Sequence, residues 1–188
     1  MEDIARLHRH ALDETRSVVA RITRAQWAAA TPCEGWDVQA LLNHIVSGNW
    51  WAAELAAGAT IEGVGDRLDG DMLHDDALAA YDASAKAAAA AFEAPGALGA
   101  PCAVSYGPVS GSVYAGHRFI DVLIHGWDLA VATDQDATLD PELVTAAYEL
   151  LRSQADMVRG SGMFGSDLHV PADAGAQTRL LAFIGRRG

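Results

Sequence analysis

The chain has 188 residues, enough for one well-cored domain, and alanine and other good helix formers supply much of its 51% apolar content. A formal charge of −12 would repel a phosphate backbone, so we expect no nucleic-acid partner. Since no apolar run reaches about 18 residues and the N-terminal MEDIARLHRH lacks an apolar signal segment, we predict a cytoplasmic protein without a membrane partner.

Apolar residues at steps of three and four predict a first helix over about residues 3–24. The segment AAATPCEGW then interrupts the pattern, because Pro32 lacks an amide hydrogen and Gly35 permits unusual backbone angles. A second helix is predicted over about 37–57, since the Asp37 carboxylate can accept hydrogen bonds from exposed backbone amides at its start.

The Gly-rich GATIEGVGDRLDGD precedes an alanine-dominated third helix over about 75–93. The following Gly and Pro disfavour helix, although AVSY could form a brief extended segment. We predict a fourth helix over about 112–133 and a fifth from Pro141 to about Arg159. The remainder is expected to form loop, a short extended piece and a final helical turn or two. The prediction is therefore a single all-α domain over 1–188, with a bundle core over about 3–159 and a short C-terminal extension over about 160–188.

The fourth predicted helix contains HRFIDVLIHGWD, in which His117, Asp121 and His125 recur every four residues on one face. Because the neighbouring residues are apolar, a carboxylate here needs a partner. A metal ion is one candidate, since imidazole and carboxylate are the ligands of catalytic zinc sites that keep one position open. His44 on the second predicted helix could supply the third ligand if these helices face each other.

Other interpretations remain open at this point. An Asp and a His four residues apart are commonly a hydrogen-bonded pair, and His44 could be a core histidine bonded to a carbonyl group. His117 could be a fourth ligand, a proton-transfer group near the metal, or an exposed residue. The remaining histidines lie in segments that look exposed or irregular and receive no role: His8, His10, His74 and His169.

Two longer motifs add a family resemblance. TPCEGWDVQALLNHIV resembles the TPCxGWxVxxLxxHxx segment of the mycothiol-dependent maleylpyruvate isomerase N-terminal domain and its metal-binding DinB-superfamily relatives. DVLIHGWDLAVATDQ resembles their second signature, and the closing TRLLAFIGR is also similar. The resemblance implies a DinB-like four-helix bundle whose metal ligands are His44, Asp121 and His125. The chain departs from the isomerase at Asp121, where that enzyme has Glu, and in having too few C-terminal residues for the isomerase's second domain.

The resemblance implies a thiol-dependent transferase or isomerase. In it a divalent metal, zinc or alternatively nickel, holds a small thiol such as mycothiol as the thiolate, which attacks an electrophilic small molecule. His117 could move a proton in that step, and Asp128 could be either an anchoring carboxylate behind the ligands or a surface acid. A metal-hydroxide hydrolase and a non-catalytic metal-stabilised ligand-binding bundle are the alternatives. Relatives also suggest a possible homodimer.

Neither cysteine is predicted to be a nucleophile. Cys33 has no basic partner nearby in sequence, and we interpret it as a small buried thiol. Cys102 lies far away without CxxC spacing, so no disulfide framework is expected. Four tryptophans are interpreted as core or pocket wall: Trp36, Trp50, Trp51 and Trp127.

Overall fold

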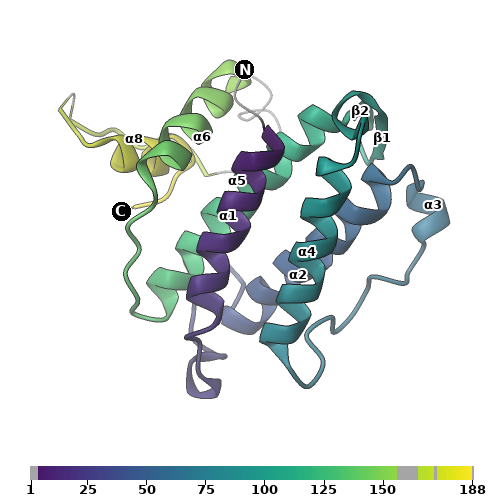
Figure 1. Cartoon of the computed structure of the whole chain (residues 1–188). Coiled ribbons are helices and arrows are strands. Elements are labelled where there is room, and N and C mark those ends of the chain that lie inside the picture. Colours follow the sequence, from purple (N-terminus) through teal and green to yellow (C-terminus); the bar gives the residue numbers. More distant parts are fainter. Residues whose placement is uncertain (1–3, 156–164, 172, 188) are drawn as a thin grey trace. The chain divides into compact units, whose positions relative to one another are not determined.

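The computed structural model describes residues 4–155, 165–171 and 173–187, and the chain divides into two compact units, residues 1–137 and 138–188. The all-α class is confirmed, with one small hairpin added (Figure 1). The elements of the first unit are α1 (Ile4–Val19), η1 (Arg24–Gln26), α2 (Val38–Ala56), α3 (Ile61–Val64), α4 (Ala77–Glu93), η2 (Ala97–Gly99), β1 (Pro101–Val104), β2 (Gly107–Ser110) and α5 (Gly111–Ala132).

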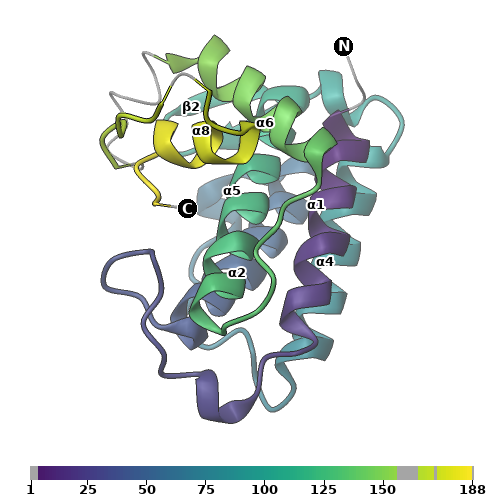
Figure 2. The same ribbon diagram turned by 90° about the vertical axis from the view of Figure 1, so that its left-hand side faces the viewer.

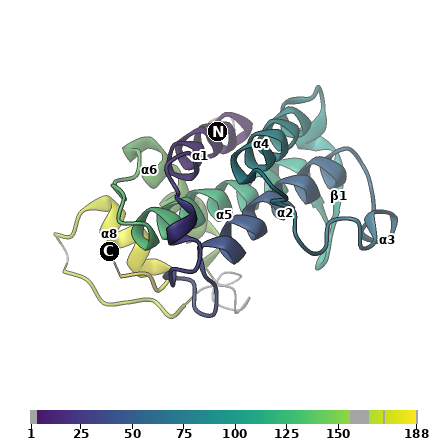
Figure 3. The same ribbon diagram turned by 90° about the horizontal axis from the view of Figure 1, so that it is seen from below.

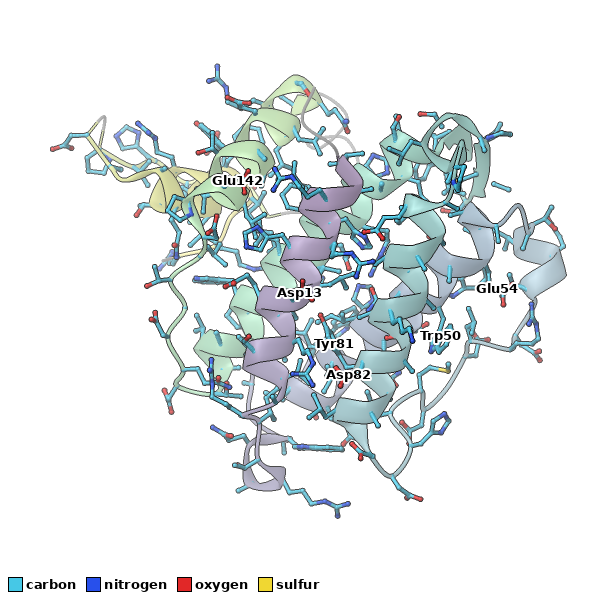
Figure 4. All side chains as sticks on the ribbon, in the orientation of Figure 1. Asp13, Trp50, Glu54, Tyr81, Asp82 and Glu142 are labelled. Atoms are coloured by element: carbon cyan, nitrogen blue, oxygen red, sulfur yellow. The ribbon has the colours of Figure 1, made fainter. Side chains whose placement is uncertain are left out.

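Helices α1, α2, α4 and α5 form a four-helix bundle, seen from two further directions in Figures 2 and 3. In Figure 1, α1 and α5 run parallel to each other, and α2 and α4 run in the opposite direction. The long connection that contains α3 returns the chain from the end of α2 to the start of α4, as a parallel pair requires. Tyr81 of α4 lies inside the bundle (Figure 4), where its hydroxyl donates to the Leu12 carbonyl at 2.8 Å.

Side-chain caps fix the starts of three bundle helices. The Asp37 carboxylate accepts from the Ala40 amide at 2.8 Å, as predicted, and Asp76 and Ser110 cap α4 and α5 in the same way. Each cap satisfies a backbone amide that has no partner within the helix. The starts of α2, α4 and α5 therefore lie within two residues of the predicted positions.

The first helix is shorter than predicted, because α1 ends at Val19. The side-chain amide of Gln135 donates to the Val18 carbonyl at 3.1 Å, so this carbonyl has a partner outside the helix. Thr23 then starts the separate turn η1 by a capping box with Gln26. Helix α3, which Thr60 caps, and the second strand of the hairpin were not predicted.

Close approach of α1 to α5 depends on Gly126. A Cβ atom at this position would lie 2.3 Å from the Thr15 hydroxyl oxygen. That hydroxyl donates to the Val122 carbonyl on the same helix as Gly126, at 3.2 Å. The glycine therefore lets α1 and α5 approach closely enough for this buried hydrogen bond to form.

The second unit contains α6 (Pro141–Ser153) and α8 (Ala176–Phe183), which pack against each other. Pro141 occupies the first turn of α6 as predicted, whereas the predicted helix end at Arg159 lies outside the described residues. The proposal of one domain over the whole chain stays a prediction. Among the described helices, none has the length and hydropathy that crossing a bilayer requires.

Candidate metal centre

The structure brings His44 of α2 together with Asp121 and His125 of α5. One carboxylate oxygen of Asp121, Oδ1, lies 3.2 Å from His44 Nε2 and 3.6 Å from His125 Nε2. The ligand atoms of all three residues lie within 4.8 Å of one another. Two ligands about 2.05 Å from a tetrahedral zinc ion are about 3.3 Å apart, so the observed spacing and donor types fit one divalent ion.

Asp128 lies behind His125, one turn further along α5. Its Oδ2 atom is 3.0 Å from His125 Nδ1, and the residue is completely buried. An imidazole that donates from Nδ1 to a carboxylate has its Nε2 lone pair available on the opposite side of the ring. The burial of Asp128 excludes the interpretation as a surface acid.

The second oxygen of Asp121 faces Arg118. Arg118 Nη1 donates to Asp121 Oδ2 at 2.9 Å, and Nη2 donates to Asn49 Oδ1 of α2 at 3.3 Å. Burial raises the pKa of the Asp121 carboxyl, but the charges of Arg118 and His125 and the hydrogen bond with His44 outweigh this and hold it well below its usual range. Asp121 is therefore a carboxylate at neutral pH although only 26% of its side chain is exposed.

A buried polar chain continues from Arg118 across the bundle. Asn49 donates to the Ser84 hydroxyl at 3.3 Å, and Ser84 donates to the Tyr81 carbonyl at 3.0 Å. Gly48 leaves space for the guanidinium, since a Cβ atom there would lie 2.5 Å from Arg118 Nη1. The bundle interior thus has both the space and the hydrogen-bond partners for the positive charge of Arg118.

Trp36 forms a wall beside the two histidines. Its ring centroid lies 4.7 Å from that of His44 and 6.0 Å from that of His125. The backbone of the TPCEGW loop is held at Trp36 by a bridge between Ala30 and Asp37 and by the Thr31 hydroxyl, which donates to the Trp36 carbonyl at 2.9 Å. The interpretation of Trp36 as pocket wall stays a prediction.

His117 is one turn before Asp121 on α5 but is not part of the group formed by His44, Asp121 and His125. Its Nδ1 atom is 2.5 Å from the hydroxyl of Tyr106, which lies between the two strands of the hairpin and is 58% exposed. The geometry therefore pairs His117 with a phenol that can exchange a proton with it.

The prediction for His8, which placed it in an exposed or irregular segment, was wrong. The residue is completely buried in α1 and meets the Phe92 ring edge-on at 5.2 Å. Burial and the charges of Arg118 and Arg9 lower the pKa of His8 to about 3. Within the described part of the chain, neither ring nitrogen of His8 has a hydrogen-bond partner.

The remaining candidates take no part in the ligand group. His74 and His169 are exposed, and His10 is half-buried on α1. Cys102 is buried, whereas Cys33 is half-buried rather than buried as predicted. Trp127 is buried, as expected for a core residue, whereas Trp50 and Trp51 are half-buried.

Sequence reasoning missed Arg118, Asn49 and Gly48. The signal for Arg118 was present, because a basic residue three positions before Asp121 lies on the same side of an otherwise apolar helix. Asn49 and Gly48 gave no comparable signal, since their role depends on how α2 and α5 face each other (Figure 3).

Comparison with known proteins agrees with the resemblance noted in the sequence. The profile of the family described as mycothiol maleylpyruvate isomerase N-terminal domain matches residues 8–130, which include the three clustered residues. Relatives include the uncharacterized proteins MT0763 and Rv0738 of Mycobacterium tuberculosis strains CDC 1551 / Oshkosh and ATCC 25618 / H37Rv. Each is 33% identical over 181 residues, which cover 95% of this chain and 95% of the relative. No solved structure matches the chain significantly.

Proposed function

The chain belongs to the mycothiol maleylpyruvate isomerase N-terminal domain family, and we propose that it binds one divalent metal ion and uses it in a thiol-dependent reaction. The metal ligands in this proposal are His44, Asp121 and His125. The thiol is mycothiol or a close chemical relative, and the second substrate is an electrophilic small molecule. The reaction is a transfer, in which the thiol stays on the product, or an isomerisation, in which it leaves again.

The observation that carries the proposal is the position of Asp121 Oδ1, which lies within 3.6 Å of both imidazole Nε2 atoms. Two imidazoles and one carboxylate leave a tetrahedral ion with one open position. Zinc suits this set of ligands, and nickel can also use it. When bound, such an ion favours the thiolate form of a coordinated thiol at neutral pH.

The surrounding side chains have separate tasks in this reaction. Asp128 fixes the ring orientation of His125 by the contact to Nδ1. Trp36 lies beside the two histidines and gives the site one apolar side. The pair of His117 and Tyr106 can take up or return a proton at the phenol oxygen when the electrophile is attacked.

The test is thiol binding followed by thiol-dependent turnover. The cobalt-loaded protein is titrated with mycothiol, and the sulfur-to-cobalt absorption band in the near ultraviolet is recorded. We expect the band in the wild-type protein and its absence in His44→Ala, with His169→Ala, at an exposed position, as the matched control.

Turnover then separates the proposal from its alternatives. Consumption of an electrophile, such as an epoxide or a halogenated alkane, should require both metal and thiol. Hydrolysis of an ester by the metal-loaded protein without thiol would instead favour a metal-hydroxide hydrolase. Metal binding with no absorption band and no turnover would favour a ligand-binding bundle.

A further inference from the structure

The two oxygens of Asp121 have different partners. Oδ1 faces His44 and His125, whereas Oδ2 accepts a hydrogen bond from Arg118 Nη1 at 2.9 Å. We propose that Arg118 is a positioning residue that keeps Asp121 a one-oxygen ligand and gives the metal position a preference for an anion as its fourth ligand. This inference rests on the proposed metal site and deepens it, because it names the charge of the ligand that the open position accepts.

The bundle holds the guanidinium in one place. Only 9% of the Arg118 side chain is exposed, and its second amino group donates to Asn49 Oδ1 at 3.3 Å. A Cβ atom at position 48 would lie within 2.7 Å of the guanidinium carbon and both amino nitrogens, so Gly48 is required for this position. Gly48 and Asn49 follow His44 by about one turn of α2. The same helix therefore supplies a proposed metal ligand and the two residues that hold the Arg118 guanidinium.

Holding Oδ2 restricts how Asp121 can bind a metal. A carboxylate with two accessible oxygens can bind one ion through both of them. Here Nη1 of Arg118 donates to one oxygen, Oδ2, and the desolvated guanidinium would lose its charged partner if Asp121 turned. Asp121 therefore offers Oδ1 alone, and a coordination position stays available for an exogenous ligand.

The charge of Arg118 determines the net charge of the metal-loaded site. The carboxylates of Asp121 and Asp128 together balance a divalent ion, and the imidazoles of His44 and His125 bind metals in their neutral form. Arg118 adds one buried positive charge within hydrogen-bond distance of a metal ligand. The loaded site is thus positive with Arg118 and neutral without it, which favours a thiolate or another small anion over a neutral ligand.

The experiment compares an anionic and a neutral ligand on the same protein. The full chain is loaded with Co²⁺, and azide or imidazole is titrated while the visible absorption spectrum of the cobalt is recorded. The variants are Arg118→Gln, which keeps hydrogen-bonding capacity without charge, and Arg118→Lys, which keeps the charge without the fork. Arg16→Gln is the matched control, because it removes an arginine that also pairs with an aspartate, Asp82, but on the bundle surface.

We expect Arg118→Gln to weaken azide binding on the order of tenfold, from the loss of one nearby charge at an intermediate dielectric constant, and to leave imidazole binding unchanged. Arg118→Lys should bind azide nearly as the wild type does. This second variant keeps the inference testable if the glutamine variant does not fold.

Equal weakening of azide and imidazole, unchanged azide binding in Arg118→Gln, or loss of azide binding in Arg118→Lys would overturn the inference. A wild-type chain that takes up no cobalt would instead refute the proposed function on which it rests. The two failures are therefore distinguishable in one series of titrations.

Discussion

Replacing His8 with leucine should make the stability of the metal-free protein less dependent on pH below neutrality. The imidazole is completely buried, and its pKa is lowered from an ordinary 6.5 to about 3 by burial and by the charges of Arg118 and Arg9; a weaker opposing effect comes from Asp121. Between these two values the unfolded chain binds a proton at His8 and the folded chain does not. The sign of the linkage is therefore loss of stability as pH falls from about 6.5 toward about 3.

The size of the effect follows from the two pKa values. Between about pH 7 and about pH 5, protonation of the unfolded chain at His8 should cost the folded state about 2 kcal/mol. His8→Leu removes this contribution and also removes two buried nitrogens that have no hydrogen-bond partner within the described residues. The variant should therefore be at least as stable as the wild type at neutral pH.

Urea unfolding followed by circular dichroism at both pH values, with a chelator present, measures the effect. The quantity to compare is the change in the free energy of unfolding between the two pH values, in wild type, His8→Leu and the control His169→Leu, which alters an exposed histidine. An equal change in wild type and His8→Leu would refute the reasoning. It would mean that the imidazole is protonated in the folded protein or reaches water.

Three further substitutions have expected outcomes. Gly48→Ala places a Cβ atom 2.5 Å from a buried guanidinium nitrogen and should lower the free energy of unfolding by about 1–3 kcal/mol in urea titrations. Asp128→Asn should weaken zinc binding about 10- to 100-fold in a competition with a fluorescent chelator, because the orienting carboxylate is lost. Gly126→Ala brings a Cβ atom to 2.3 Å from the Thr15 hydroxyl and should lower Tm. Thr15→Ala in the same chain should recover part of that loss.

Matched controls accompany these variants. Gly99→Ala introduces the same methyl group where no atom lies within 4 Å, and it should leave stability nearly unchanged. Asp13→Asn changes an exposed carboxylate of α1 and should leave zinc affinity unchanged. If a control variant lost as much stability or zinc affinity as its test variant, the loss would come from the type of substitution and not from the contact that the test variant changes.

Local sequence signals were sufficient for the positions of the main helices. The cap at Asp37, the proline at the start of α6 and the glycine-rich breaks each act within a few residues, so they are visible without tertiary structure. The element bounds that were predicted wrongly depend on residues far away in the sequence. The end of α1 at Val19 involves Gln135, which is more than a hundred positions away in the sequence.

The candidate site was only partly predictable for the same reason. The spacing of Asp121 and His125 puts them on one face of a helix, but pairing them with His44 required the family resemblance, because α2 and α5 meet only in the folded chain. His8 lies on the apolar stripe of α1, and its polar side chain concealed its burial. Arg118 could have been found from the sequence by asking what neutralises Asp121 within its own helix.

We propose that His44, Asp121 and His125 bind a metal ion together. The most direct test is to measure bound metal by elemental mass spectrometry in protein purified without a histidine tag and equilibrated with zinc, for the wild type, His44→Ala, His125→Ala and His74→Ala. We expect near-stoichiometric zinc in the wild type and in His74→Ala, whose side chain is exposed, and loss of zinc in the other two. A wild-type protein that retains no metal, or a His44→Ala variant that retains all of it, would contradict the claim.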